Sequence, residues 1–265
     1  MGYGVCNKLL RFNHPIWRLI STSILIGIFV FSGCAEVSIQ TYVKNGKEYG
    51  KTKGAFRNRW GNYYERGLSF AEGEFYIEAE ADLKEAIRQR PKDQRMARTY
   101  GMHFIVDYFP NRELGVIYFQ MGNLEAAKRE LELSIRQFPS AKAYFYLNRV
   151  RKGIIEKKGQ PVQPPNLSLD FNKDLVWTNK DPVVISGVAE DEHFISNISI
   201  KEKTLFLEGS QKEVYFKENL RLSQGRHTIE VTARNLLDKA TTKRVLIHVD
   251  RDGPVIILED LQPGQ

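Results

Sequence analysis

The same pattern of small and apolar residues occurs twice in this chain, at an offset of 48 residues. Within each copy the apolar positions recur every three or four residues, as on the buried face of a helix. A proline closes each copy and cannot continue a helix. The sequence therefore predicts an internal repeat of helical hairpins. The corresponding positions are Gly67, Phe70, Ala79, Leu83, Ala86, Ile87 and Pro91, and then Gly115, Tyr118, Ala127, Leu131, Ser134, Ile135 and Pro139.

The spacing of these positions resembles that of the tetratricopeptide repeat, a helical hairpin of about 34 residues. Trp60 and Tyr108 open the two copies. The resemblance implies repeats at 60–93 and 108–141, which leaves the 14 residues 94–107 inserted between them. The two copies are expected to hold one small residue against the next helix, so that the helices approach closely.

A third helix is expected over 142–158, where it would cover the last apolar face of the stack and complete a domain at 60–158. Lys157 and Lys158 followed by Gly159 suit the end of that helix. The turn glycines of the two hairpins, Gly73 and Gly122, are 49 residues apart. The two turns are therefore expected to differ in length by one residue.

The first 33 residues carry three basic residues and no acidic one. After the third basic residue comes an uncharged run of thirteen residues, Leu19 to Phe31. That run is shorter than the ~20 apolar residues of a membrane-spanning helix and suits a secretory signal. Residues 31–34, Phe-Ser-Gly-Cys, resemble the lipobox of bacterial lipoproteins, which implies cleavage of a signal peptide at 1–33 and lipidation of Cys34. The alternative is an uncleaved anchor with an incidental cysteine. In many Gram-negative bacteria, an aspartate directly after the lipidated cysteine retains a lipoprotein in the inner membrane. Residue 35 is alanine, so the resemblance favours the outer membrane, facing the periplasm.

Residues 34–59 are expected to form a tether. Alternating apolar residues precede Asn45 and Gly46, which indicates a small β-hairpin. Six basic residues in this stretch could lie on anionic lipid, and the alternative is a solvated linker. They are Lys44, Lys47, Lys51, Lys53, Arg57 and Arg59.

The formal net charge of +7 gives little support to a nucleic-acid partner. Removal of the signal peptide leaves 36 basic and 32 acidic residues, because all three charges lost are positive. No clustered basic helix is present in the remaining sequence. Two cysteines, Cys6 and Cys34, do not provide a disulfide framework.

After a proline-rich linker at 159–165 the hydrophobic period changes from helical to two. About seven short strands are expected over 166–258, followed by a tail at 259–265. Seven short alternating strands are typical of a β-sandwich of immunoglobulin type. The alternating runs are 167–171, 183–185, 198–200, 205–207, 214–216, 229–233 and 245–249.

Two long motifs, RWGNYYERGLSFAEGEF and KDQRMARTYGMHFIVDYFPNRELG, resemble bacterial envelope tetratricopeptide proteins that carry an immunoglobulin-like module after the repeats. The resemblance covers residues 46–258, and its β part is similar to the disulfide-free modules of glucodextranase B type. It implies an α+β multidomain fold, with helical hairpins followed by an all-β sandwich. Asn111 and Gly61 depart from the histidine and tryptophan that the family pattern would place there.

The sequence gives little support to catalysis. The five histidines are scattered, with no metalloprotease motif and no nucleophile elbow. His227 and His248 are expected on outward strand faces, exposed to solvent. An acidic cluster at 190–193 is interpreted as a polar turn, with a calcium site as the alternative. We therefore expect no enzyme activity, no cofactor and no metal.

In tetratricopeptide repeats, five positions of each unit face a concave surface, and the resemblance implies a protein-binding groove there. The inserted residues 94–107 could instead fill this groove. The expected function is a lipid-anchored envelope scaffold that binds envelope proteins or peptides; its oligomeric state is left open. The alternatives are a cell-wall or polysaccharide binding module that uses the β-sandwich, and an accessory subunit of a secreted enzyme. The expected groove residues are Tyr64, Leu68, Glu72, Arg112, Val116, Phe119, Gln120 and Tyr146.

Overall fold

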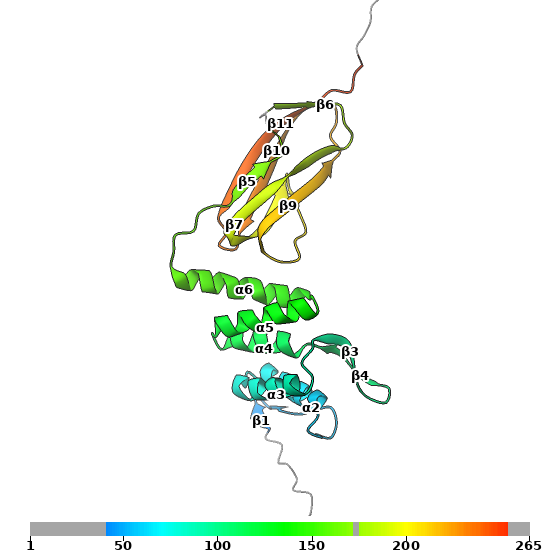
Figure 1. The fold of residues 1–265 in the computed structure, drawn as a ribbon, viewed down its shortest axis with the longest axis vertical. Coiled ribbons are helices and arrows are strands. Elements are labelled where there is room, and N and C mark those ends of the chain that lie inside the picture. Colours follow the sequence, from blue (N-terminus) through cyan, green and yellow to red (C-terminus); the bar gives the residue numbers. More distant parts are fainter. Residues whose placement is uncertain (1–40, 172–174, 254–265) are drawn as a thin grey trace, which may run out of the picture. The chain divides into compact units, whose positions relative to one another are not determined.

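The computed structural model describes residues 41–171 and 175–253, so the expected signal peptide and Cys34 lie outside the described residues. The described part contains five helices and a large β-sheet region, an α+β protein (Figure 1). None of the described helices is long and apolar enough to cross a membrane. The helices are α2 (Trp60–Glu72), α3 (Tyr76–Gln89), α4 (Pro110–Gln120), α5 (Leu124–Gln137) and α6 (Ala141–Lys158).

Helices α2 and α3 form one hairpin and α4 and α5 form a second, as the repeated pattern predicted. Gly67 faces Leu83 between α2 and α3, and Gly115 faces Leu131 between α4 and α5. A Cβ atom would lie 3.1 Å from the Leu83 side chain at the first glycine and 2.7 Å from the Leu131 side chain at the second. The absence of a side chain at these positions therefore sets how closely the paired helices pack. Helix α6 packs on α5, and its Gly159 ends it in the left-handed conformation, as expected.

The two hairpin turns have the same length, which corrects the expected difference of one residue. Gly122 has a φ of 76°, and the residue with positive φ in the first turn is Glu74, at 66°. Gly73 has an ordinary right-handed φ of −79°. Its lack of a side chain serves packing, because a Cβ there would lie 2.7 Å from the rings of Phe75 and Tyr49.

The expected hairpin around Asn45 and Gly46 is confirmed: β1 (Tyr42–Lys44) pairs with β2 (Lys47–Tyr49), and both turn residues have positive φ. It lies against the α2–α3 hairpin on the side away from α4 (Figure 1). Tyr42 stacks on Phe75 with 4.7 Å between ring centroids and donates a hydrogen bond of 3.0 Å to Glu78. Residues 42–49 of the expected tether are therefore folded onto the helices.

Residues 94–108 form a second hairpin, in which β3 (Gln94–Tyr100) pairs antiparallel with β4 (His103–Tyr108). It projects from the connection between α3 and α4, with its turn away from the helices (Figure 1). Its base is anchored by Tyr108, which is fully buried and whose hydroxyl donates to the carbonyls of Ala86 and Arg90. The inserted segment therefore begins and ends in the helical core while its turn lies outside.

The region after α6 is a seven-stranded sheet in which β7 pairs with strands on both sides. Its first half pairs with β5 and β9, and its second half with β10 and β8. The register shifts between Glu190 and Ile195, where β7 passes from one set of partners to the other. The strands are β5 (Asn166–Leu169), β6 (Leu175–Thr178), β7 (Val183–Ile200), β8 (Lys203–Thr204), β9 (Gln211–Leu220), β10 (Gly225–Asn235) and β11 (Ala240–Val249).

Alternate residues of these strands, such as Ile229, Val231 and Ala233, are fully buried in one apolar core. Two expectations for this region are wrong in detail. The runs 183–185 and 198–200 belong to one continuous strand, and 205–207 is not a strand. The sequence also gave no sign of β6, which pairs parallel with β11.

His248 is not the solvated side chain expected from the alternation of β11. Trp177 on β6 lies beside it, with 4.0 Å between the ring centroids. The Nδ1 atom of His248 is buried and has no hydrogen-bond partner among the described residues. The error follows from the missed strand, because β6 covers a position that would otherwise face water.

Candidate binding surfaces

The first helix of each hairpin and α6 line one face of the helical stack, since α4 contacts both α2 and α6. Most of the residues expected in a groove lie on these three helices at partly exposed positions. Leu68, Phe119 and Tyr146 are half-buried and pack against the helical core. Val116 is half-buried and Gln120 is exposed.

Tyr64 is an exception, because its side chain is only 2% exposed and does not line an open surface. Its hydroxyl donates to the carbonyl of Asp107 at 2.8 Å and accepts from the backbone N–H of Phe109 at 3.2 Å. Its ring packs edge-on against Tyr108. Burial raises the pKa of Tyr64 above its ordinary value, since the phenolate would be desolvated. The base of the inserted hairpin covers this position, which the pattern of an uninterrupted repeat would leave open.

Arg112 and Glu72 are in the expected region but are already paired. The Arg112 guanidinium lies 4.1 Å from the ring centroid of Phe109 and is within 2.7 Å of a Glu113 carboxylate oxygen. Only 13% of the Arg112 side chain is exposed, and Glu113 is also paired with Lys142 of α6. Glu72 is paired with Lys47 of β2. These charges hold elements together, so they present little free charge to a partner.

An aromatic cluster occupies the other end of α4 and the adjoining part of α6. Phe119 and Tyr146 meet edge-on at 5.7 Å between centroids, and Phe145 meets Tyr146 at 5.3 Å. The Arg149 guanidinium lies 5.6 Å from the Phe119 ring and 5.4 Å from the Phe145 ring. Phe145 is 53% exposed and Arg149 is exposed as well. Neither residue was among the expected groove residues, although their spacing of four places them on one face of a helix.

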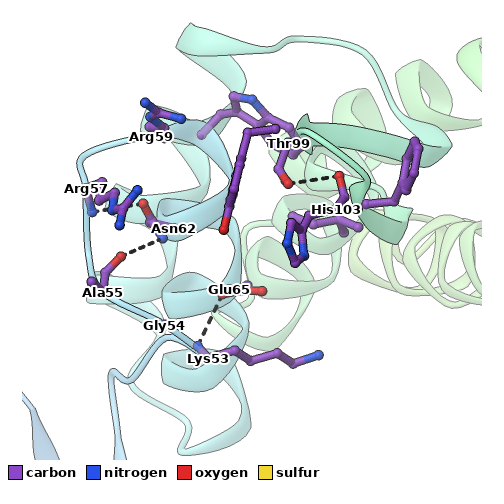
Figure 2. Close-up of a pocket in the computed structure, with 14 residues that line it drawn as sticks. Lys53, Gly54, Ala55, Arg57, Arg59, Asn62, Glu65, Thr99 and His103 are labelled. Atoms are coloured by element: carbon purple, nitrogen blue, oxygen red, sulfur yellow. Dashed lines mark hydrogen bonds between the residues drawn. The ribbon is translucent and has the colours of Figure 1, made fainter.

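A second candidate surface is a cavity of about 420 Å³ between the β3–β4 hairpin, the loop 53–59 and the first turns of α2 (Figure 2). Thr99 and His103 of the hairpin line one wall, and the basic loop lines the other. Gly61 lies beneath them, where a Cβ would be 3.3 Å from Ile105. The glycine that departs from the family pattern therefore lets the hairpin close against α2.

The loop preceding α2 is fixed along that helix by hydrogen bonds to its side chains. The Gly50 N–H donates to Ser69 Oγ at 3.0 Å, the Lys53 N–H to Glu65 at 3.3 Å, and the Arg57 N–H to Asn62 at 2.9 Å. Arg66 stacks on Phe56 at 4.2 Å and pairs with buried Asp82 through two bonds of 2.6 Å. The loop therefore runs back along α2 in a defined position and carries its cations to the hairpin.

Most of the ionisable side chains that line this cavity are basic. Lys53, Arg57, Arg59 and His103 line it, and Glu65 is the only carboxylate among its lining residues. Between Gln94 and Val106 the sequence has no acidic residue. The basic loop and the inserted segment are both recognisable in the sequence, but no local pattern predicts that they lie side by side.

The described residues contain no group of three or more histidine, cysteine, aspartate or glutamate side chains placed to hold a metal ion. In the acidic cluster at 190–193, the Asp191 carboxylate accepts from the His193 N–H at 2.6 Å and from Asn235 Nδ2 at 2.9 Å. The cluster lies within β7, where the register shifts, and not in the polar turn that was expected. Asp191 thus bonds this irregular part of β7 to the end of β10.

Comparisons with known proteins show partial similarities. No known family profile matches the chain. Bacillopeptidase F of Bacillus subtilis is 32% identical over 104 residues, which is 39% of this chain and 7% of that protein. The chain therefore corresponds to a small part of that relative.

Three solved structures are similar to parts of the chain. The fibronectin(III)-like modules of Clostridium thermocellum CbhA are 24% identical, covering 34% of this chain and 48% of theirs, with a TM-score of 0.26. MamA 41-end from Desulfovibrio magneticus RS-1 is 18% identical, covering 38% and 50%, with a TM-score of 0.30. Bacteroides ovatus SGBP-B, solved with a mixed-linkage heptasaccharide, is 14% identical, covering 33% and 24%, with a TM-score of 0.24. TM-scores this low do not assign the chain to a family.

Proposed function

We propose that this protein is a non-enzymatic, lipid-anchored scaffold of the bacterial cell envelope that binds a protein partner on the face formed by α2, α4 and α6. In this proposal the helical hairpins are tetratricopeptide repeats and the β region that follows is an immunoglobulin-like sandwich. The observation that carries the proposal is the cluster of Phe119, Tyr146, Phe145 and Arg149 on neighbouring helices. Aromatic and arginine side chains of this kind dominate the binding energy of protein interfaces.

Site-specific photo-crosslinking would locate the partner. A photoreactive amino acid at exposed Gln120, beside the cluster on α4, should crosslink an envelope protein in cells. The same probe at Ile77, which is 74% exposed on α3, serves as the matched control on the outer helix of a hairpin. Equal crosslinking at both positions would show that this face is not the binding surface.

Phe145→Ala combined with Arg149→Ala should reduce crosslinking from position 120 by roughly 30-fold, as expected for the loss of a hot spot. Thermal stability should change little, because both side chains are exposed. This pair is a cleaner test than Arg112 with Phe119. Removal of Arg112 would leave Glu113 with Lys142 alone, and Phe119 packs against the core. Undiminished crosslinking in the folded double variant would contradict the proposal.

The anchor has its own test. Cys34→Ala should abolish incorporation of labelled fatty acid and shift the protein out of the detergent-phase membrane fraction, because attachment depends on buried acyl methylenes at ~0.8 kcal/mol each. Cys6→Ala is the matched control and should leave labelling unchanged. Labelling that is absent from the wild type, or that persists in Cys34→Ala, would rule out this anchor.

A further inference from the structure

The hairpin formed by β3 and β4 exposes large apolar side chains to an unusual degree. Met102 in its turn is 84% exposed. Exposed apolar residues gathered in one place mark an interaction surface, whereas single ones need no explanation. The exposed apolar residues of the hairpin are Met96, Tyr100, Met102, Phe104 and Val106, all within 11 consecutive residues.

The surface beside the β3–β4 hairpin is basic, and the cations of the loop 53–59 have no carboxylate paired with them among the described residues. In the first hairpin and just after it, Lys44, Lys47 and Lys51 each form an ion pair with a glutamate. Lys53 and Arg57, farther along the loop, form none with any described residue, and neither does Arg59. The hairpin itself adds Arg98, whose Nε donates to the Gly101 carbonyl at 2.7 Å across the turn. A partner that covers both features must be apolar where it meets Met102 and negatively charged around it.

These features are held in one place rather than on separate mobile segments. The backbone bonds from Lys53 and Arg57 to α2 fix the loop, and Ile105 packs over Gly61 to fix the hairpin. The cavity between them is lined by both, so the cations lie beside the strand residues that flank the hairpin turn, such as Thr99 and His103 (Figure 2). A protruding apolar turn with cations beside the strands that lead to it has the features of a peripheral membrane-binding element.

The length of the chain before the described residues favours a bilayer over a free protein partner. Six residues, 35–40, separate Cys34 from Thr41. Seven extended peptide steps span at most roughly 25 Å. Because β1 and β2 are folded onto the helices, the rest of the expected tether adds no further reach. This one step rests on the proposed lipid anchor, which would hold the described unit close to the membrane surface.

We propose that the β3–β4 hairpin and the loop 53–59 form a membrane-docking edge, with Tyr100 and Met102 entering the interface of an anionic bilayer and Lys53, Arg57 and Arg59 binding its headgroups. The apolar residues supply the insertion and the cations supply the preference for anionic lipid. Docking would fix which way the partner-binding face points relative to the membrane.

Vesicle sedimentation tests the docking edge without the anchor. Residues 41–265 form a compact unit of their own and contain no cysteine, so they can be studied alone. They should bind vesicles of phosphatidylcholine and phosphatidylglycerol in a two-to-one ratio, bind pure phosphatidylcholine weakly, and dissociate as salt is raised. Tyr100→Glu with Met102→Glu, and separately Arg57→Glu with Arg59→Glu, should each lower the partition coefficient at least roughly tenfold. Phe206→Glu is the control, because Phe206 is 87% exposed outside the helical part and should have no effect.

A fluorescent label tests directly whether the turn of the β3–β4 hairpin enters the bilayer. Met102→Cys introduces the sole cysteine of this unit, and a polarity-sensitive dye there should shift its emission to the blue with anionic vesicles, while the same dye at Phe206→Cys should not. Absence of vesicle binding, or binding unchanged by both charge-reversing and tip variants, would overturn the proposal. A dye at position 102 that stays in water while the protein binds would also overturn it, and would direct attention to an acidic protein partner. None of these results depends on Cys34, so failure here is distinguishable from failure of the lipid anchor.

Discussion

Tyr108→Ala should lower the free energy of unfolding of the helical part by about 3–5 kcal/mol, the range for truncating a large buried aromatic residue. The side chain is fully buried, with its ring 4.6 Å from that of Trp60 and 4.8 Å from that of Tyr64. Its hydroxyl also donates to the carbonyls of Ala86 at 3.1 Å and Arg90 at 2.7 Å. Urea unfolding followed by helical circular dichroism would measure the loss.

Two further variants separate the contributions of this residue. Tyr108→Phe keeps the ring and removes only the hydroxyl, so it should cost about 1 kcal/mol. Tyr100→Ala removes a tyrosine from the same hairpin at a position that is 56% exposed, and it should change stability by less than about 0.5 kcal/mol. If Tyr108→Ala and Tyr100→Ala unfold at the same urea concentration, the hairpin is not anchored in the core as described.

Asp93→Ala should lower the free energy of unfolding by about 3 kcal/mol, because it removes a buried carboxylate that accepts several hydrogen bonds. Asp93 is 3% exposed, and its carboxylate accepts from the backbone N–H of Asn111 at 2.9 Å and that of Arg112 at 3.2 Å. These are N–H groups of the first turn of α4, which has Pro110 at its start and no cap from its own N-cap side chain. A negative charge at this end also interacts favourably with the helix dipole.

The matched control is Asp107→Ala. The Asp107 side chain is 57% exposed and pairs with Arg95 at 3.3 Å, so its removal should change stability by less than about 1 kcal/mol. Both variants remove one carboxylate, since Asp93 immediately precedes the inserted segment 94–107 and Asp107 ends it. Equal thermal shifts for the two would contradict the capping role of Asp93.

Asn111 shows why a departure from a family pattern can be compatible with a folded site. Its Nδ2 donates to the Pro91 carbonyl at 2.9 Å and to the Asp93 carboxylate at 2.8 Å, and lies 3.2 Å from Gln137 Oε1. The side chain therefore connects the end of the first hairpin to the start of the second. The sequence identified the position as unusual but gave no information about these partners, which are distant in the chain.

Local patterns in the sequence predicted the elements whose causes are local. The helical period, the prolines and the Asn45-Gly46 turn each act within a few residues, and the corresponding helices and hairpin are present. The turn after α2 was predicted wrongly because Gly73 and Gly122 were taken as equivalent positions, whereas the residue that corresponds to Gly122 in conformation is Glu74. Gly73 is needed instead by the neighbouring rings, which no local rule detects.

The candidate sites depend on contacts between distant segments and were therefore predicted only in part. The resemblance to tetratricopeptide repeats placed Phe119 and Tyr146 on a common face, where their rings meet. The same resemblance placed Tyr64 on that face, but Asp107 and Tyr108 of the inserted hairpin cover it. The basic loop and the hairpin come together only because hydrogen bonds to α2 turn the loop back along the helix.

The β1–β2 hairpin also determines how the protein can assemble. It occupies the free side of the α2–α3 hairpin, and Tyr42 fills that side by stacking on Phe75 and meeting Phe70 at 5.9 Å (Figure 1). At the opposite end of the helical stack, α6 covers α5. An array of repeats grows by laying one open apolar face on another, and here both terminal faces are covered. Copies of this protein should therefore not polymerise end to end through their helical hairpins, because neither end of the stack offers an open apolar face to a second copy.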